Sequence, residues 1–216
     1  HFKIQNNLIM DEIRVLIVED EPLIAENIAM YLNNHDFKVS GIAYDDEEAF
    51  GELKNNPPDA VLLDVNLESP KNGIDIAEYI NSNNRIPFVF LTSYSDKTIV
   101  DRAKKTNPAG YIVKPFNEQT LYTTLEIAMT NFASRANQHV PKLSLTRINQ
   151  SLPSPLSDRE FEVIQLIYDG KTNQQICDLL FIAMNTVKRH VTNAYFKLDV
   201  NSRSSAISLL RELMLK

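Results

Sequence analysis

The stretch AVLLDVNL at residues 60–67 contains an apolar run that ends on a carboxylate. The apolar residues 60–63 are typical of a strand that is buried on both faces. Asp64 follows them directly, and a carboxylate at that place loses hydration unless another group compensates. We therefore expect Asp64 either to cap the following turn or to face a cation or a phosphoryl group.

Similar strand patterns alternate with helical patterns over residues 13–129. The strand-like segments are IRVLIV, FKVSGIA, AVLLD, PFVFL and GYIV, and the helical segments that follow them are PLIAENIAMYL, DEEAFGELK, GIDIAEYI, DKTIVDRAKK and EQTLYTTLEIAM. Five such pairs predict an α/β fold, in which helices cover both faces of a parallel sheet. Ligands of such folds bind beyond the carboxyl ends of the strands, which is where Asp64 falls.

The composition of the chain is that of a globular protein, with 44% apolar and 23% charged residues in a length of 216. Cys177 is the only cysteine, so no disulfide can form within the chain. No stretch approaches the roughly 18 apolar residues of a membrane span. We expect a reducing, cytoplasmic setting, with residues 1–10 as a tail rather than a signal peptide.

The charge is distributed unevenly along the chain. Residues 1–132 carry 11 basic and 21 acidic side chains, whereas residues 133–216 carry 11 basic and 7 acidic side chains. Periodicity fades after residue 132, and Pro141, Pro153 and Pro155 interrupt the segment that follows. We predict a domain at residues 12–132, a linker at residues 133–155 and a second domain at residues 156–216, each domain with a different partner.

The second domain has a purely helical pattern. In SDREFEVIQLIYDG, Ser157 and Glu160 have the spacing of a capping box, and Thr172 and Gln175 repeat that spacing in TNQQICDLL. A longer helix is predicted from about Met184 to Leu198, and a last helix from about Ser202. The expected structure is a small all-α domain.

Acidic side chains gather where strands of the first domain end. Glu19 and Asp20 close the first strand, and Asp64 closes the third. Carboxylates about 4 Å apart repel by roughly 4 kcal/mol at an effective dielectric constant near 20, so three in one cleft require a cation. Oxygen ligands favour Mg²⁺, with Asp20, Asp64 and the backbone carbonyl of Asn66 as ligands.

A hydroxyl and an ammonium are expected at the same edge of the sheet, because the fourth strand ends in Thr92 and the fifth runs into Lys114. Together with the carboxylates, these groups suit phosphoryl transfer to Asp64. Lys114 and Thr92 would hold the phosphoryl oxygens. Pro115 is expected to set the turn after Lys114, and a cis bond is compatible with it.

The segments VLIVEDE, LLDVNL, FLTSYSD and YIVKPF resemble, in this order, the signature segments of response-regulator receiver domains over about residues 12–132. The resemblance implies a five-stranded flavodoxin-like fold, a required Mg²⁺ ion and a histidine kinase as phosphodonor. It makes Asp64 the phosphoacceptor, Glu19 and Asp20 the acidic pair, and Lys114 the associated lysine. Thr92 and Tyr111 would be the switch residues. Glu19 departs from the more usual Asp, which leaves open whether it contacts the metal directly or through water.

The helix predicted in NTVKRHVTNAYFKL has one apolar and one polar face. The polar face carries Lys188, Arg189, Thr192 and Asn193 and no acid, so it could enter the major groove of DNA. TNQQICDLL and the short connection after it would complete a helix-turn-helix.

The segments LSDREFEVIQLI, KTNQQICDLL, TVKRHVTNAYFKL and SRSSAI are similar to the LuxR-type DNA-binding domain over about residues 156–216, and with the receiver they resemble a NarL/FixJ-type transcription regulator. The resemblance implies a dimer contact through the last helix. It makes Lys188, Arg189 and Thr192 base-facing residues, and Thr186, Asn193 and Lys197 phosphate-contacting residues.

Two positions depart from the pattern of the LuxR-type domain. Ala183 and Met184 leave the start of the recognition helix without its usual side-chain cap, so that Asn185 remains as a cap candidate. Asp199 stands at a helix stop where a left-handed residue is expected.

The function expected from the sequence is that of a two-component response regulator rather than an enzyme. When phosphorylated, this regulator is expected to bind double-stranded DNA as a homodimer. One alternative is a Mg²⁺-dependent phosphohydrolase with Asp64 as nucleophile, but its general acid commonly lies two residues later, where this chain has Asn66. A second alternative is a regulator that is active without phosphate or that binds RNA. The presence of Asp20, Asp64, Thr92 and Lys114 together argues against a regulator that is active without phosphate. The base-facing polar face of the predicted recognition helix argues against RNA as its partner.

Overall fold

The computed structural model describes residues 12–33, 35–93 and 97–216. The chain divides into an N-terminal unit, Ile13–Phe132, and a C-terminal unit that includes Ala133–Lys216. The predicted tail at residues 1–10 and the last three residues of the FLTSYSD segment lie outside the described residues. Within the described parts, no helix combines the length and the apolar character needed to cross a membrane.

The N-terminal unit is built on a parallel sheet of five strands: β1 (Ile13–Val18), β2 (Phe37–Ala43), β3 (Ala60–Asp64), β4 (Phe88–Thr92) and β5 (Gly110–Val113). Their order in the sheet is β2-β1-β3-β4-β5. This is the flavodoxin-like order, so the predicted fold is confirmed.

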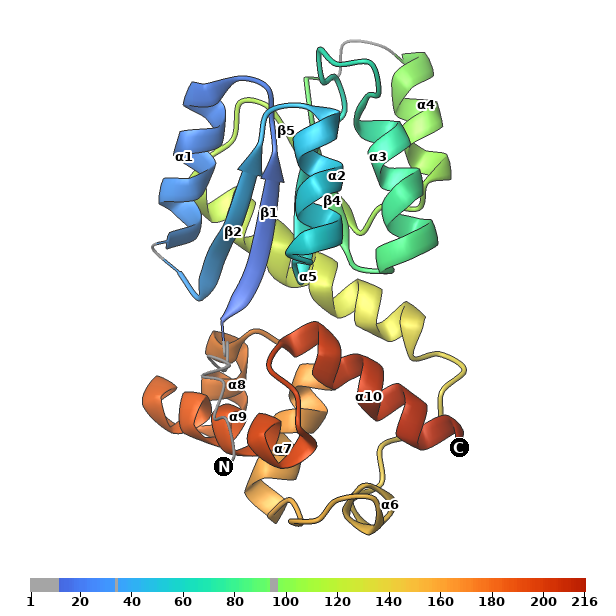
Figure 1. Ribbon diagram of the computed structural model, residues 1–216. Helices are drawn as coiled ribbons and strands as arrows, with labels where there is room; N and C mark the ends of the chain where they lie inside the picture. The colour runs from blue at the N-terminus through green and yellow to red at the C-terminus, as the bar shows by residue number, and fades with distance from the viewer. Residues whose placement is uncertain (1–11, 34, 94–96) are drawn as a thin grey trace, which may run out of the picture. The chain divides into compact units, whose positions relative to one another are not determined.

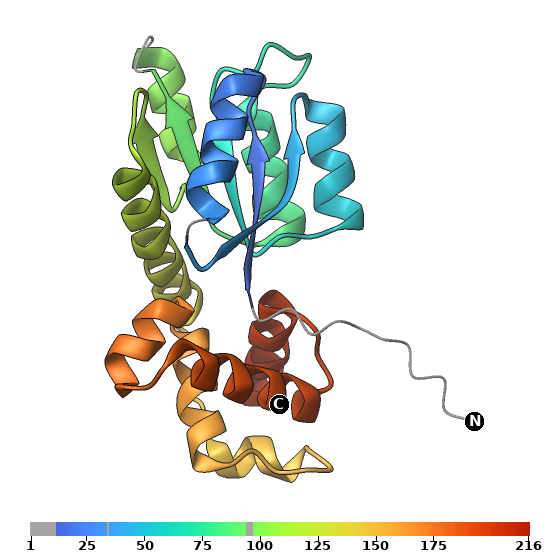
Figure 2. The same cartoon turned by 90° about the vertical axis from the view of Figure 1, so that its left-hand side faces the viewer.

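Helices cover both faces of this sheet (Figures 1 and 2). Apolar residues of α1 (Pro22–Asn33) and α5 (Glu118–Ala136) pack on one face with Ile17 and Leu62. Residues of α2 (Asp46–Asn55), α3 (Gly73–Tyr79) and α4 (Lys97–Lys105) pack on the other face with Leu63 and Phe90. A π-helical turn, η1 (Ile80–Asn84), extends α3. Because both faces are covered, the strands are apolar throughout, as in AVLLD.

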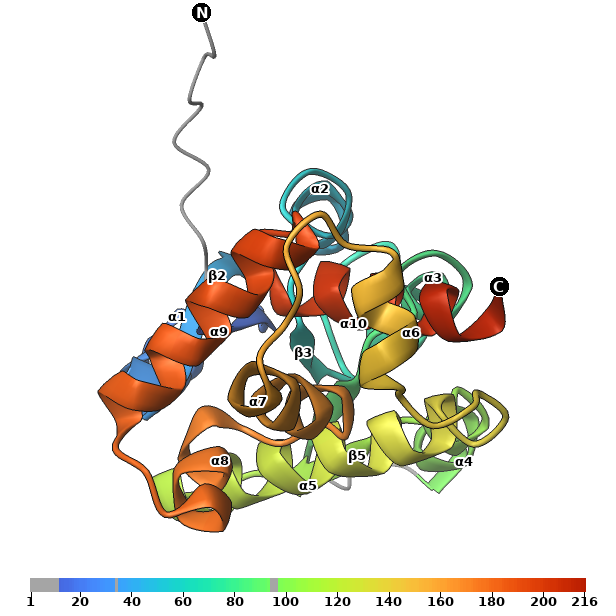
Figure 3. The same ribbon diagram turned by 90° about the horizontal axis from the view of Figure 1, so that it is seen from below.

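The C-terminal unit contains α6 (Leu145–Gln150), α7 (Asp158–Tyr168), α8 (Asn173–Leu180), α9 (Met184–Leu198) and α10 (Arg203–Leu215), seen together in Figure 3. Their apolar faces share one core, which includes Ile167, Ile176, Val191 and Leu210. The capping boxes Ser157/Glu160 and Thr172/Gln175 are both present, as predicted.

Both ends of α9 have the features expected from the two positions that depart from the LuxR-type pattern. Ala183 is its N-cap and makes no side-chain hydrogen bond, and Asp199 ends it in the left-handed conformation with φ 56°. Asn185 lies inside the helix, so the expectation that it caps α9 is wrong.

The segment predicted as a linker contains folded structure. Ser144 caps α6 through its side chain, and Ile148 of α6 is fully buried in the core of the C-terminal unit. The boundaries of the linker stay a prediction.

Candidate functional site

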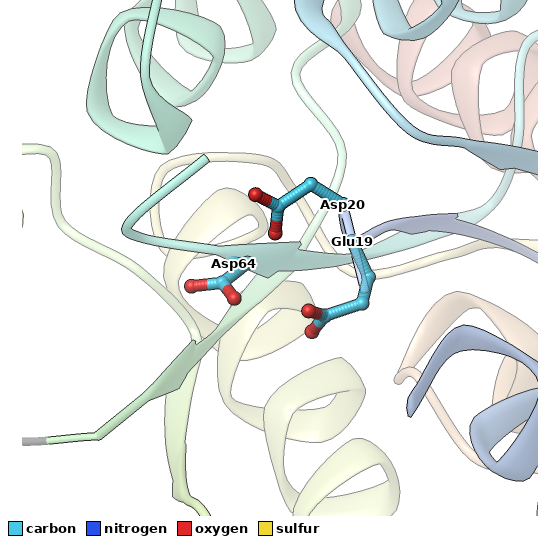
Figure 4. A group of neighbouring side chains, drawn as sticks. All are labelled: Glu19, Asp20 and Asp64. Carbon is cyan, nitrogen blue, oxygen red and sulfur yellow. The ribbon is translucent and has the colours of Figure 1, made fainter. Parts of the chain in front are cut away.

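The carboxylates of Glu19, Asp20 and Asp64 meet at one edge of the parallel sheet, where β1 and β3 end. Figure 4 shows the three side chains facing one another. Each offers an oxygen atom, and these atoms all lie within 4.8 Å of one another. The topology produces this cluster, because the carboxyl ends of neighbouring parallel strands lie at the same edge.

Lys114 follows β5 and supplies a positive charge to this cluster. Its Nζ atom lies 2.6 Å from Oδ2 of Asp64 and 2.7 Å from Oε2 of Glu19. Its backbone N–H donates to the carbonyl of Thr92 over 2.8 Å. The Lys114–Pro115 peptide bond is cis. Lys114 is therefore fixed at the edge of the sheet by its backbone and its side chain.

Burial decides the electrostatics of this cluster. The Glu19 side chain has no exposed surface, and this burial raises its pKa to about 7, against the lowering effect of the hydrogen bond from Lys114. Burial also lowers the pKa of Lys114, but its hydrogen bonds to Asp64 and Glu19 outweigh that effect and raise the pKa above its ordinary value. The ammonium thus stays charged at neutral pH.

The turn cap expected for Asp64 is present, and its second carboxylate oxygen pairs with Lys114. Its Oδ1 atom accepts a hydrogen bond from the backbone N–H of Asn66 over 2.8 Å, which caps the turn, while Oδ2 faces Lys114. The backbone of Gly73 packs so closely that a Cβ atom there would lie 1.9 Å from the carbonyl oxygen of Asp64. This requirement for glycine was missed by the sequence reasoning, because it depends on the end of β3 meeting the start of α3.

The remaining predicted residues lie around this cluster. β3 and β4 pair Asp64 with Leu91, so Thr92 follows one residue further toward the same edge, and it is buried. Asp20 accepts a hydrogen bond from the backbone N–H of Glu68 over 3.0 Å. Tyr111 is half-buried in β5, and the centroid of its ring lies 5.9 Å from the centroid of the Phe90 ring.

The donor set fits a small divalent cation. Mg²⁺ prefers carboxylate and carbonyl oxygens, and Glu19, Asp20 and Asp64 offer three carboxylates. The raised pKa of Glu19 points the same way, because the positive charge of Lys114 does not fully offset the hydration that this carboxylate has lost. A metal ion would supply the missing positive charge.

The C-terminal unit presents a second candidate site on α9. Lys188 is partly exposed, and Arg189, Thr192 and Asn193 are exposed, so the predicted polar face is accessible in the C-terminal unit. Thr186 is partly exposed next to this face. Cationic, hydroxyl and amide side chains such as these are the groups with which DNA-binding proteins contact phosphates and base edges.

Lys197 differs from the other predicted contacts, because its ammonium is engaged within the unit. Nζ lies 2.7 Å from Oε2 of Glu160 and 2.9 Å from the carbonyl oxygen of Pro155. A phosphate contact from Lys197 stays a prediction, and it would have to compete with this ion pair.

Phe196 is a residue of the same face that the sequence reasoning missed. Its side chain is 78% exposed. The signal was available, because residues 185, 189, 192 and 196 are spaced by three or four and therefore share one side of a helix.

Comparison with known proteins finds the same two parts. Residues 15–126 match the family described as "Response regulator receiver domain", and residues 154–210 match the family "Bacterial regulatory proteins, luxR family". The chain is 31% identical over 201 residues to the transcriptional regulatory protein LiaR of Bacillus subtilis (strain 168), covering 90% of this chain and 94% of LiaR. It is 29% identical to the response regulator protein VraR of Staphylococcus saprophyticus, covering 90% and 94% of the two chains.

A solved structure resembles the N-terminal unit. The signal receiver domain of a modulated diguanylate cyclase from Desulfovibrio desulfuricans G20 is 31% identical and superposes with a TM-score of 0.55, covering 57% of this chain and 98% of that domain.

Proposed function

The chain belongs to the two-component response regulators that join a receiver domain to a LuxR-type DNA-binding domain, and we propose that it accepts a phosphoryl group on Asp64 from a histidine kinase and thereby controls transcription. The family consists of transcription regulators rather than classical enzymes. The observation that carries the proposal is the contact of 2.6 Å between Lys114 Nζ and Asp64 Oδ2 inside a cluster of three carboxylates. The proposed setting is the cytoplasm.

Phosphoryl transfer would use Asp64 as the nucleophile. A carboxylate oxygen of Asp64 attacks the phosphorus of the phosphohistidine donor, the phosphorus–nitrogen bond breaks, and its electron pair stays on the imidazole. An aspartyl phosphate remains. Lys114 would move from the Asp64 carboxylate to a phosphoryl oxygen, and the Thr92 hydroxyl would hold another.

Mg²⁺, held by Glu19, Asp20, Asp64 and the backbone carbonyl of Asn66, would neutralise negative charge on the transferred group. Glu19 would reach the ion directly or through a bridging water, since glutamate reaches further than aspartate. The phosphohydrolase alternative lacks support because Asn66 occupies the place of its general acid.

The added phosphoryl group would act as a switch, because it brings about −1.5 to −2 charges into a site that is already acidic. Thr92 would turn toward the phosphoryl group and Tyr111 would move inward, which changes the surface formed by α4 and α5. The changed surface would favour a homodimer. A dimer binds two half-sites together, so the affinity for operator DNA rises through effective concentration.

On DNA, Lys188, Arg189 and Thr192 would face bases, and Thr186 and Asn193 would contact phosphates. Lys197 would also contact a phosphate, which would have to compete with Glu160 for its ammonium group. The absence of acidic residues from positions 184–198 supports DNA as the partner of α9.

Treatment with acetyl phosphate and Mg²⁺ tests the receiver half. The intact mass should rise by about 80 Da, the mass of one phosphoryl group. Asp64→Asn should stay unlabelled, with Asp75→Asn as the control that still labels. Labelling of Asp64→Asn to the same extent as the wild type would remove the assignment of Asp64 as the phosphoacceptor.

Selection of bound DNA from a random pool, with and without acetyl phosphate, tests the DNA-binding half.

A further inference from the structure

Phe196 occupies the centre of the outward face of α9. Successive helical residues turn by about 100°, which places Asn185, Arg189, Thr192 and Phe196 within an arc of about 60°. The buried residues Val187, Val191, Ala194 and Leu198 lie on the opposite side of the helix. Phe196 is 78% exposed, so its ring points away from the core of the C-terminal unit.

The surroundings of Phe196 favour nucleic acid as its partner. Lys188 and Arg189 lie on or beside the same face, and residues 184–198 contain no acid. A positively charged face of this kind is complementary to the phosphates that line a DNA groove. A single exposed aromatic ring is common on protein surfaces, but this ring lies among the residues proposed to enter the groove.

The major groove offers one apolar feature to such a ring, the 5-methyl group of thymine. We infer that Phe196 is a specificity-determining residue that packs against the methyl group of a thymine in each half-site. The inference rests on the proposed DNA-binding function and adds a base identity to it. Phe196 would read thymine by contact area, whereas Arg189 reads a base edge by hydrogen bonds.

The spacing on the helix predicts where this thymine lies. Phe196 follows Arg189 by seven residues, which corresponds to about 10 Å along a helix. Bases along one strand are about 3.4 Å apart. Where α9 follows the groove, the thymine should lie about three base pairs from the base that faces Arg189.

Exchange of thymine for deoxyuridine tests the inference, because it removes only the methyl group. In the sequence selected from the random pool, each thymine is replaced singly, and binding is measured by fluorescence anisotropy at fixed salt. The wild-type chain should bind about fourfold more weakly when the critical thymine is exchanged, the factor that corresponds to burial of one methyl group.

Phe196→Ala should bind the operator with thymine and the operator with deoxyuridine equally tightly. Phe196→Leu should keep part of the difference in affinity between these two operators. Phe181→Ala is the matched control, because Phe181 is also exposed, at 92%, but lies in the turn before α9. This variant should keep the full difference. Far-UV circular dichroism checks that all three variants are folded.

The outcomes separate this inference from the proposed function. A pool that yields no enriched sequence would overturn both DNA binding and the role of Phe196. An enriched sequence without a fixed thymine would overturn the role of Phe196 alone, as would equal sensitivity of the wild type and Phe196→Ala to the exchange. A lower oligomer mass of Phe196→Ala with unchanged sensitivity would reassign the ring to a protein contact.

Discussion

Lys114 and Asp64 are 50 residues apart in the sequence, and their Nζ and Oδ2 atoms lie 2.6 Å apart. The two residues follow β5 and end β3, and β4 lies between these strands in the sheet. The lysine therefore reaches across one strand to neutralise the proposed phosphoacceptor. The same ammonium also contacts Glu19, so it balances two carboxylates at once.

Removal of this ammonium should destabilise the N-terminal unit. Lys114→Met leaves Glu19 and Asp64 buried without their cation, and loss of one partner of a buried ion pair costs about 3–5 kcal/mol. Urea denaturation without Mg²⁺ should show this loss in the free energy of unfolding, and added Mg²⁺ should restore part of it. Lys104→Met is the control, because Lys104 is 63% exposed in its ion pair and should matter little. Equal stability of the two variants would contradict the role assigned to Lys114.

A methyl group at position 73 should disturb the proposed phosphoacceptor loop. Gly73→Ala places a Cβ atom against the carbonyl oxygen of Asp64, and such overpacking typically costs about 1–3 kcal/mol. Gly51→Ala is the matched control, because its new Cβ atom in α2 would meet no atom within 4 Å beyond its chain neighbours and the backbone of its own helix. It should stabilise the protein by about 0.5–1 kcal/mol. Thermal denaturation compares the two, and a Gly73→Ala variant as stable as Gly51→Ala would refute the close approach.

The ion pair of Glu160 and Lys197 should make the stability of the C-terminal unit depend on pH. Burial raises the pKa of Glu160, but hydrogen bonds from Lys197 and Ser157 outweigh burial and lower the pKa below its ordinary value of 4.5. A carboxyl group with a lowered pKa in the folded state stabilises the fold above pH 4.5, and this contribution is lost as the pH falls through the folded-state value. Hydrogen exchange of α9 amides at a series of pH values measures the effect.

In that experiment, Glu160→Gln should lower the free energy of opening by about 1–3 kcal/mol at pH 7, and its difference from the wild type should shrink below pH 4.5. Glu162→Gln removes only an exposed pair with Arg159 and should change little. If the difference in opening free energy between the wild type and Glu160→Gln grew on acidification, the pKa of Glu160 would not be lowered in the folded state.

Truncation of the basic residues on α9 should weaken DNA binding. Lys188→Ala or Arg189→Ala should cost about 1–3 kcal/mol of binding free energy where the residue contacts a base. Where it contacts phosphate, the plot of the logarithm of the binding constant against the logarithm of the salt concentration should become less steep by about one unit. Fluorescence anisotropy over a salt series separates these two contacts. Lys216→Ala is the control, because Lys216 is exposed and lies outside α9. If all three variants bound like the wild type, α9 would not be the recognition element.

Much of the fold follows from local sequence signals. Buried parallel strands need apolar residues on both faces, so the β-rich apolar runs AVLLD and PFVFL predict β3 and β4. The capping boxes at Ser157 and Thr172 involve residues three positions apart, and the left-handed Asp199 ends its own helix. Such features depend only on neighbours in the chain, and the sequence predicts them correctly.

Two features that depend on distant residues were not predicted. The close approach at Gly73 requires the loop after β3 to meet the start of α3, and the contact of Lys197 joins residues 37 positions apart. No periodicity records either contact. For the acidic cluster, prediction succeeded because parallel strands bring their carboxyl ends together in any such fold.

Helix α6 has a practical consequence for cutting the chain into separate modules. Ile148 fills the core beneath α7 and α10, and Leu143, Leu145 and Leu152 pack around the same core. A fragment that starts at residue 156, the boundary suggested by sequence patterns, would expose that apolar surface to water and invite aggregation. A fragment that starts at residue 133 keeps the whole interior closed.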